Sequence, residues 1–137
     1  MIEQRADAVW RGGLKEGSGS FSAGSLAGKY SFSSRFEGGA GSSPEELIGA
    51  AHASCFSMAF SNMLAQAGHA PEEVNTKADV TFVPGTGITG SHLTVSARIP
   101  GISEEEFQRI AGEAKTGCPV SGALASIEIT LEASLQS

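Results

Sequence analysis

Cys55 and Cys118 are the two cysteines of this chain and the residues whose chemistry is most specific. Cys55 lies in the middle of a long apolar run, and Cys118 lies in the segment 117–121, Gly-Cys-Pro-Val-Ser. A lone buried cysteine is most often a small core residue. No secretory signal is evident ahead of them, however, so we expect a cytoplasmic protein, in which a permanent disulfide is rare. Together the two settings favour a thiol pair that carries out redox chemistry.

The length and charge of the chain limit the classes of function. Its 137 residues predict a single domain over 1–137. The formal net charge is −6, and acidic and basic residues are interspersed without a basic run. We therefore expect neither a nucleic acid nor a membrane surface as a partner.

The apolar run around the first cysteine predicts one long helix. Ser43 is a typical N-cap, Pro44 suits the first helical position, Glu46 completes a capping box, and Gly68 is a stop signal. The segment 47–71 has no formally charged side chain, and the apolar residues of its helical part surround the axis, as in a buried helix or a membrane span. Polar residues within it and acidic flanks weigh against the membrane. We expect a buried central helix.

The remaining elements are predicted from periodicity and turn residues. The stretch 12–28 is rich in Gly and Ser and indicates turns between short strands. Alternation predicts strands, the second and third of them an antiparallel hairpin, and a capping box predicts a second, shorter helix. The strands are expected ahead of Arg35 from Tyr30, over 77–82, over 92–99 and over 127–135, and the helix over 103–117. This order indicates an α+β fold with antiparallel sheets.

A helix that is apolar all round is difficult to bury in so small a protein. One sheet covers only one face of a helix, and a second subunit would cover the other. The sequence therefore predicts a homodimer with an isologous interface that encloses the long helices of both chains.

Three segments closely resemble the superfamily of osmotically inducible protein C (OsmC) and organic hydroperoxide resistance (Ohr) proteins. They are Phe-Glu-Gly at 36–38, Ser-Pro-Glu-Glu-Leu-Ile-Gly-Ala-Ala-His-Ala-Ser-Cys-Phe-Ser-Met-Ala at 43–59, and Gly-Cys-Pro-Val-Ser at 117–121. The resemblance covers nearly the whole chain, and Arg35 directly before Phe36 favours the OsmC branch. It implies an intertwined OsmC-like homodimer and a thiol-dependent peroxidase that reduces organic hydroperoxides to alcohols. It also implies that Cys55 is the peroxidatic cysteine and Cys118 the resolving one.

The expected mechanism requires a cation beside Cys55. An unperturbed thiol is only a few per cent thiolate at neutral pH, and the interior of a helix does not lower its pKa. A guanidinium about 4 Å away contributes roughly 4 kcal/mol before desolvation is subtracted. The resemblance assigns this role to Arg35, with Glu45 holding the guanidinium in place. Three residues are candidates for an apolar wall of the substrate site, although core packing is the commoner role: Phe36, Phe56 and Met58.

The resemblance further implies a cycle of oxidation and reduction. Cys55 becomes a sulfenic acid, Cys118 condenses with it to a disulfide, and an external dithiol restores both thiols. A lipoyl-type dithiol is the reductant suggested by analogy with the Ohr branch. No metal or cofactor is expected.

Three alternatives remain open. A non-catalytic redox sensor or hydroperoxide-binding module would use the same disulfide as a switch. His52, three residues before Cys55, permits a Cys-His hydrolase, although no oxyanion-hole motif or orienting Asp or Asn is evident and a core imidazole is more frequent. A metal site of His52, Cys55 and Cys118 would lack a fourth ligand and the usual zinc spacing.

The spacing of the expected site residues raises a geometric problem. Glu45 and Cys55 are ten positions apart, which in a straight helix is roughly 15 Å along the axis. They cannot both contact one arginine in that case. Either the helix breaks near Gly49, or Arg35 and Glu45 reach Cys55 from the partner subunit, which the predicted dimer favours.

Overall fold

A computed structural model describes residues 1–136 of the chain, which forms two compact units. The first unit is Met1–Leu47, and the second begins at Ile48. The boundary falls inside the long helix. Whether the chain acts as a single domain over 1–137 stays a prediction.

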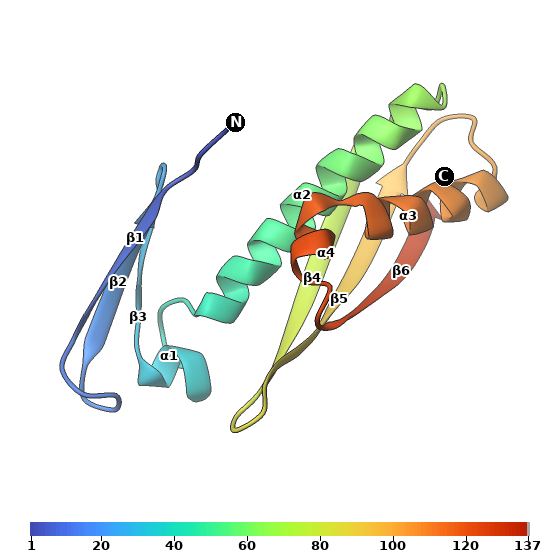
Figure 1. Ribbon diagram of the computed structural model, residues 1–137. Helices are drawn as coiled ribbons and strands as arrows, with labels where there is room; N and C mark the ends of the chain where they lie inside the picture. Colours follow the sequence, from blue (N-terminus) through green and yellow to red (C-terminus); the bar gives the residue numbers. More distant parts are fainter. Residues whose placement is uncertain (137) are drawn as a thin grey trace. The chain divides into compact units, whose positions relative to one another are not determined.

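The first unit contains a small antiparallel sheet (Figure 1). Its strands are β1 (Ala6–Arg11), β2 (Ser18–Ala23) and β3 (Leu26–Tyr30), in that order. Gly24, with φ +60°, opens the two-residue turn between β2 and β3, a backbone conformation that favours glycine. The predicted short strands separated by Gly- and Ser-rich turns are therefore confirmed.

The strand predicted from Tyr30 to Arg35 is wrong beyond Tyr30. Residues Phe32–Phe36 form a short helix, α1. The Ser31 hydroxyl accepts from the Ser34 amide at 3.1 Å, and the Ser34 hydroxyl accepts from the Ser31 amide at 2.8 Å. In the sequence, serines alternate with aromatic residues from Tyr30 and so indicated the polar face of a strand. In the structure, Ser31 and Ser34 form a capping box, a pair of reciprocal hydrogen bonds that starts a helix.

The long helix α2 spans Pro44–Gln66, which confirms its prediction. The Ser43 hydroxyl accepts from the Glu46 amide at 3.1 Å, as the N-cap assignment requires. The helix is long and apolar enough to cross a membrane by length and composition. One of its faces nevertheless packs against the sheet of the second unit, as a core helix of a soluble protein does. That face carries His52, Phe56, Phe60 and Leu64, all fully buried and spaced four residues apart.

The opposite face of α2 remains uncovered in the single chain. Met58 on that face is 77% exposed. One sheet therefore buries only one side of this helix, as the sequence argument anticipated.

The second unit contains a mixed sheet in the order β4-β5-β6. Its strands are β4 (Glu73–Val83), β5 (Gly87–Arg98) and β6 (Glu128–Gln136). The predicted hairpin of β4 and β5 is antiparallel, but β6 pairs with β5 in parallel, so the prediction of purely antiparallel sheets is wrong. Two helices connect β5 to β6 and carry the chain back along the sheet, and such a crossover makes parallel neighbours.

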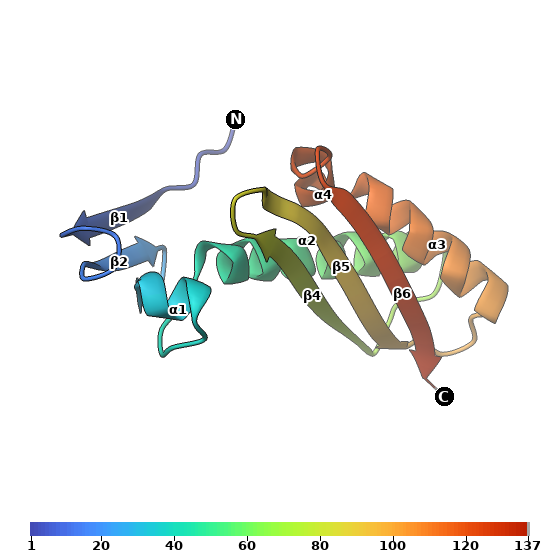
Figure 2. The same cartoon turned by 90° about the horizontal axis from the view of Figure 1, so that it is seen from below.

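The crossover helices are α3 (Glu104–Gly117) and α4 (Pro119–Ala123). The Ser103 hydroxyl caps α3 by accepting from the Glu106 amide at 3.2 Å, which confirms the predicted second helix, whereas α4 was not predicted. Figure 2 shows α2 and α3 on the same face of the sheet, and their apolar sides form the core with the inner face of β5. The core consists of Phe56, Phe60, Leu64, Leu93, Val95, Ala97, Ile99, Phe107, Ile110, Ala111, Ala114 and Cys118.

Candidate active site

The two cysteines lie next to each other in the second unit. Cys55 is on α2 and partly exposed, whereas Cys118 joins α3 to α4 and is 1% exposed. Their thiols are close enough to shift each other's pKa, and both are reduced. The sequence predicted this pairing from the resemblance alone. The geometry gives an accessible thiol that a substrate can reach and a buried thiol placed to react with it.

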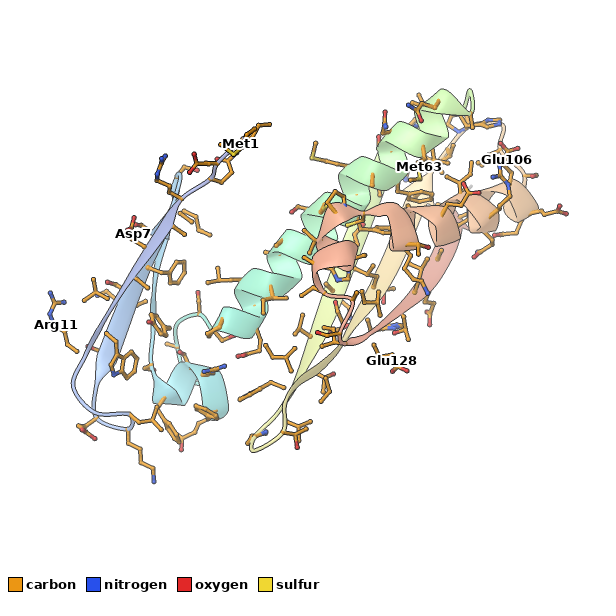
Figure 3. The ribbon with its side chains drawn as sticks, in the orientation of Figure 1. Met1, Asp7, Arg11, Met63, Glu106 and Glu128 are labelled. Atoms are coloured by element: carbon orange, nitrogen blue, oxygen red, sulfur yellow. The ribbon has the colours of Figure 1, made fainter. Side chains whose placement is uncertain are left out.

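Gly117 lets the end of α3 approach α2 closely. A Cβ atom at this position would lie 3.1 Å from the terminal methyl of Met63, closer than ordinary packing allows. Met63 projects from α2 (Figure 3). The glycine before Cys118 therefore helps to bring the two thiols together.

The environments of the two thiols shift their pKa values in opposite directions. Burial raises the pKa of Cys55, and the hydrogen bond to Cys118 raises it further, against a smaller effect of the Val120 amide. Burial also acts to raise the pKa of Cys118, but hydrogen bonds from Cys55, from the Ser121 amide and hydroxyl, and from the Val120 amide together lower it. The two thiols therefore titrate as a coupled pair.

His52, three residues before Cys55 on α2, is fully buried and hydrogen-bonded through both ring nitrogens. Nδ1 lies 2.7 Å from the Ser91 hydroxyl on β5, and Nε2 lies 2.8 Å from the Ser121 hydroxyl on α4. Burial lowers the pKa of His52, so its ring is neutral at neutral pH. Because both nitrogens are engaged with serines, neither is left for the direct contact with Cys55 that a Cys-His hydrolase requires.

In the first unit, Arg35 and Glu45 form the ion pair that the sequence predicted. Nε of Arg35 donates to Oε1 of Glu45 at 3.1 Å, and Nη2 donates to Oε2 at 2.7 Å. This two-pronged hydrogen bond and the charge of Glu45 raise the pKa of Arg35, against a lowering effect of burial. The Ser34 hydroxyl donates to the Ser42 carbonyl at 2.7 Å and so ties α1 to the segment that begins α2. The guanidinium is therefore held at a fixed place in its own unit.

The three residues predicted to form an apolar wall lie in different surroundings. Phe56 is fully buried in the core, with its ring 5.5 Å from that of Phe60. Met58 lies on the uncovered face of α2, and Phe36 is 37% exposed and stacked on Phe32 at 4.7 Å. Their contact with a substrate stays a prediction.

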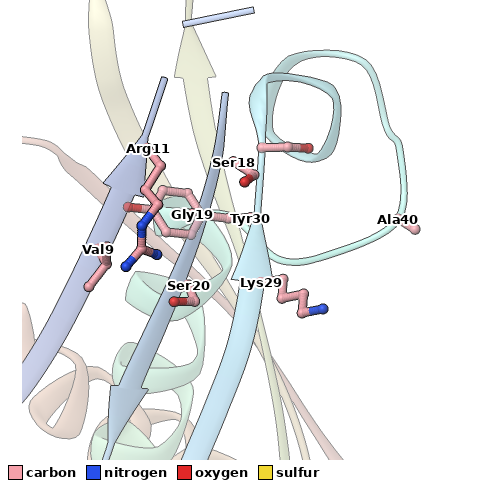
Figure 4. A pocket seen from close by; sticks show the side chains of 9 residues that line it. Val9, Arg11, Ser18, Gly19, Ser20, Lys29, Tyr30 and Ala40 are labelled. Atoms are coloured by element: carbon pink, nitrogen blue, oxygen red, sulfur yellow. The ribbon is translucent and has the colours of Figure 1, made fainter. Parts of the chain in front are cut away.

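The first unit also carries a hollow of about 420 Å³ beside its sheet (Figure 4). Arg11, Ser20, Lys29 and Tyr30 are among the residues that line it, and none of the predicted site residues does. Within residues 1–136, no group of three or more His, Cys, Asp or Glu side chains could hold a metal ion.

Sequence reasoning missed the two serines that bond His52, Ser91 and Ser121. Ser121 is three residues after Cys118, a spacing that places both on one side of a short helix, and this could have been noticed. Ser91 had no such signal, because it comes close only when β5 packs against α2.

Comparison with known proteins places the chain in a family. The sequence profile of the family described as OsmC-like protein matches residues 37–132. Peroxiredoxin OsmC from Escherichia coli (strain K12) is 46% identical over 142 aligned residues, which cover 99% of each protein. The organic hydroperoxide resistance protein from Xanthomonas axonopodis pv. citri (strain 306) is 32% identical over 96 residues, covering 69% of this chain and 68% of that protein.

Solved structures share the fold. An OsmC like protein from Mycoplasma pneumoniae aligns with a TM-score of 0.76 at 16% identity, over 99% of both chains. An organic hydroperoxide resistance protein from Elizabethkingia anophelis aligns with a TM-score of 0.71 at 26% identity, over 98% of this chain and 99% of that one. With a profile match over more than half of its length and a relative 46% identical across nearly all of it, this chain belongs to the OsmC-like family.

Proposed function

We propose that the chain is a thiol-dependent peroxidase that reduces organic hydroperoxides to alcohols. The observation that carries this proposal is the contact between a partly exposed Cys55 and a buried Cys118, in a chain 46% identical to a peroxiredoxin over nearly its full length. A thiolate that attacks a peroxide needs access to the substrate, and the thiol that closes the cycle needs only to reach the first sulfur. The two cysteines meet these two requirements.

In the first step, the Cys55 thiolate attacks the outer oxygen of the hydroperoxide. A sulfur–oxygen bond forms, the O–O bond breaks, and the departing alkoxide takes up a proton to become the alcohol. Cys55 is oxidised to a sulfenic acid and the peroxide is reduced. Cys118 then forms a disulfide with Cys55 and water leaves, and an external dithiol of the lipoyl type in the cytoplasm reduces the disulfide.

Arg35 and Glu45 complete the site in this proposal. Because its surroundings within the chain raise the pKa of Cys55, a cation is needed to form its thiolate at neutral pH. Arg35 supplies this charge and stabilises the departing alkoxide, and the two hydrogen bonds to Glu45 hold its guanidinium in orientation.

We infer that this ion pair reaches the cysteine from the partner subunit of a homodimer. The uncovered face of α2, with Met58 77% exposed, supports a second subunit, and α2 is one continuous helix from Pro44 to Gln66. Glu45 and Cys55 are thus separated by roughly 15 Å along its axis. Phe36 and Met58 are available at such an interface to contact the alkyl group of the substrate, and Phe56 supports the helix from the core side.

Subunit exchange tests the shared site. The inactive Cys55→Ser and Arg35→Met proteins are mixed under exchange conditions, and native mass spectrometry confirms the heterodimers. A shared site regenerates one competent centre per heterodimer, with Cys55 from one chain and Arg35 from the other. If confirmed heterodimers have no activity, Arg35 belongs to the chain that carries its own cysteine.

Peroxide consumption in the presence of dihydrolipoamide tests the function itself. Hydrogen peroxide, a tertiary alkyl hydroperoxide and a fatty-acid hydroperoxide are compared, and the proposal requires many turnovers with the organic peroxides. Consumption of a single equivalent identifies a redox sensor or hydroperoxide-binding module. Cleavage of an ester without peroxide consumption identifies a hydrolase.

A further inference from the structure

Two hydrogen bonds and a neighbouring hydroxyl connect a buried imidazole to the resolving thiol. Ser91 bonds His52 at 2.7 Å, His52 bonds Ser121 at 2.8 Å, and the Ser121 hydroxyl acts on the Cys118 thiol three residues earlier in the chain, whose pKa it lowers. His52 is fully buried, Ser91 is 2% exposed and Ser121 is 5% exposed. The described part of the chain leaves no buried side-chain nitrogen or oxygen without a partner, so the network is complete. The proposed peroxidase cycle makes no use of it.

The direction of these hydrogen bonds depends on the charge of Cys118. A serine hydroxyl has only one proton to donate. When Cys118 is a thiolate, the Ser121 hydroxyl donates to the sulfur, so Nε2 of His52 carries a proton and donates to Ser121. When Cys118 is a thiol that donates to Ser121, the hydroxyl donates to Nε2, and Nδ1 donates to Ser91. The position of the proton on His52 therefore follows the ionisation of Cys118.

We propose that His52 accepts the proton of the Cys118 thiol, through Ser121, as the disulfide forms, and so acts as a positioning residue for the resolving step. This proposal rests on the proposed peroxidase function and adds a residue to its second half. The Cys118 thiol has no direct access to solvent, because it is 1% exposed. Ser121 and His52, which together are called the relay, give its proton a path that does not require water.

The step balances in atoms and electrons. The sulfur–sulfur bond between Cys55 and Cys118 forms as the sulfur–oxygen bond of the Cys55 sulfenic acid breaks. The Cys118 sulfur is oxidised and the Cys55 sulfur is reduced. The Cys118 proton moves to Ser121 as the Ser121 proton moves to Nε2 of His52. The departing hydroxide takes a proton from the solvent at the partly exposed Cys55 and leaves as water, and His52 later loses its extra proton.

The surroundings of His52 leave this relay without a competing charge in direct contact. Cys55 is the titratable neighbour on α2 itself, and α4 carries no charged residue. On the elements packed around His52, two kinds of charged or titratable group occur: some are bonded to residues other than His52, and one lies at the end of its helix. His92 of β5 bonds Thr130 at 2.6 Å, Lys77 and Asp79 of β4 pair with each other at 3.6 Å and are 70% and 61% exposed, and Lys115 lies in the last turn of α3.

A single-turnover experiment without reductant separates this proposal from the peroxidase function. Reduced protein receives one equivalent of an alkyl hydroperoxide at a series of pH values. Peroxide loss reports the attack by Cys55, and dimedone labelling against time reports how fast the sulfenic acid becomes a disulfide. His52→Gln retains a hydrogen bond to Ser121 but cannot take up a proton, and Ser121→Ala interrupts the relay. Ser57→Ala is the matched control, because it removes a comparable bond from α2 to Thr76 of β4 at 2.7 Å.

We expect both relay variants to lose peroxide at a rate close to that of the control but to form the disulfide about 100-fold more slowly at neutral pH. The deficit should shrink as the pH rises, because hydroxide then ionises Cys118 without help. Ser121→Thr, which retains the hydroxyl, should restore the rate.

Two results would overturn the inference alone. One is a normal rate of disulfide formation in the relay variants, and the other is a deficit of the same size at every pH, which a purely structural role would give. Failure of the wild-type protein to consume peroxide contradicts the peroxidase function instead. If His52→Gln does not fold, as judged by its thermal unfolding, Ser121→Ala and Ser121→Thr decide the question.

Discussion

Replacing Arg35 by Lys and by Met tests the role of the cation in the proposed site. The expected loss of activity can be calculated from the hydrogen bonds between Arg35 and Glu45. Lys keeps the charge but replaces the planar fork, so it can retain only one of the two hydrogen bonds, at 3.1 and 2.7 Å, to Glu45. A hydrogen bond to a charged group contributes about 1.5–3 kcal/mol. Because the Arg35 side chain is 33% exposed, solvent replaces part of the loss, and the lower end of that range applies.

A loss of about 1.5 kcal/mol in the interaction that orients the cation corresponds to roughly a tenfold lower kcat/KM of Arg35→Lys for an alkyl hydroperoxide. Arg35→Met removes the charge as well. A charge about 4 Å from the thiolate is worth roughly 4 kcal/mol, or up to three pKa units before desolvation is subtracted, so we expect the Cys55 pKa to rise by about one to two units.

Ultraviolet absorbance of the thiolate as a function of pH measures this shift, and steady-state peroxide consumption measures kcat/KM. The thiolate titrations, with Arg35 intact and with Arg35→Met, are made in a Cys118→Ser background, so that a single thiolate is observed. The reasoning is refuted if the Cys55 pKa is unchanged in Arg35→Met. It is also refuted if Arg35→Lys is as active as the wild type, because the fork would then contribute nothing to orientation.

Two further predictions concern the thiols and the buried imidazole. Cys55→Ser should abolish peroxide reduction, whereas Cys118→Ser should complete one turnover and leave Cys55 as a sulfenic acid that dimedone traps; full multi-turnover activity of Cys118→Ser with dihydrolipoamide would contradict the resolving role. Burial lowers the pKa of His52 from its ordinary value of 6.5, so below pH 6.5 the unfolded state binds a proton that the folded state resists. The free energy of unfolding should therefore fall on acidification by up to about 1.4 kcal/mol per pH unit from this group, and urea unfolding of His52→Gln should show a smaller loss over the same range; equal slopes would show that His52 titrates alike in both states.

Much of the fold was predictable because its signals are local. Ser43, Pro44 and Gly68 define the ends of α2, and the capping serine of α3 and the alternation in β4 and β5 act within a few residues. The strand expected at Tyr30 to Arg35 failed because serine serves equally as the polar side of a strand and as a cap, and the reciprocal bonds of Ser31 and Ser34 decided between them.

Relations between distant segments were less accessible from the sequence. The parallel pairing of β6 with β5 depends on the path of α3 and α4, which no local pattern encodes. The proximity of Cys55 and Cys118 came from the family resemblance rather than from the residues themselves. The contacts of His52 with Ser91 and Ser121 span 39 and 69 positions and arise only when the sheet and helices pack together.

The place of the two thiols in the fold also couples oxidation to thermodynamic stability. Cys55 is on α2, and Cys118 lies within the crossover between α3 and α4, so a disulfide between them closes a loop that contains β4, β5 and α3. Cross-linking a loop of roughly 60 residues removes chain entropy from the unfolded state on the order of 4 kcal/mol. Each proposed catalytic cycle would thus alternate the chain between an oxidised form with a higher free energy of unfolding and a reduced form with a lower one. A protein in cells under peroxide load would be harder to unfold and to degrade while it is oxidised, and it would return to its ordinary turnover once the dithiol has reduced it.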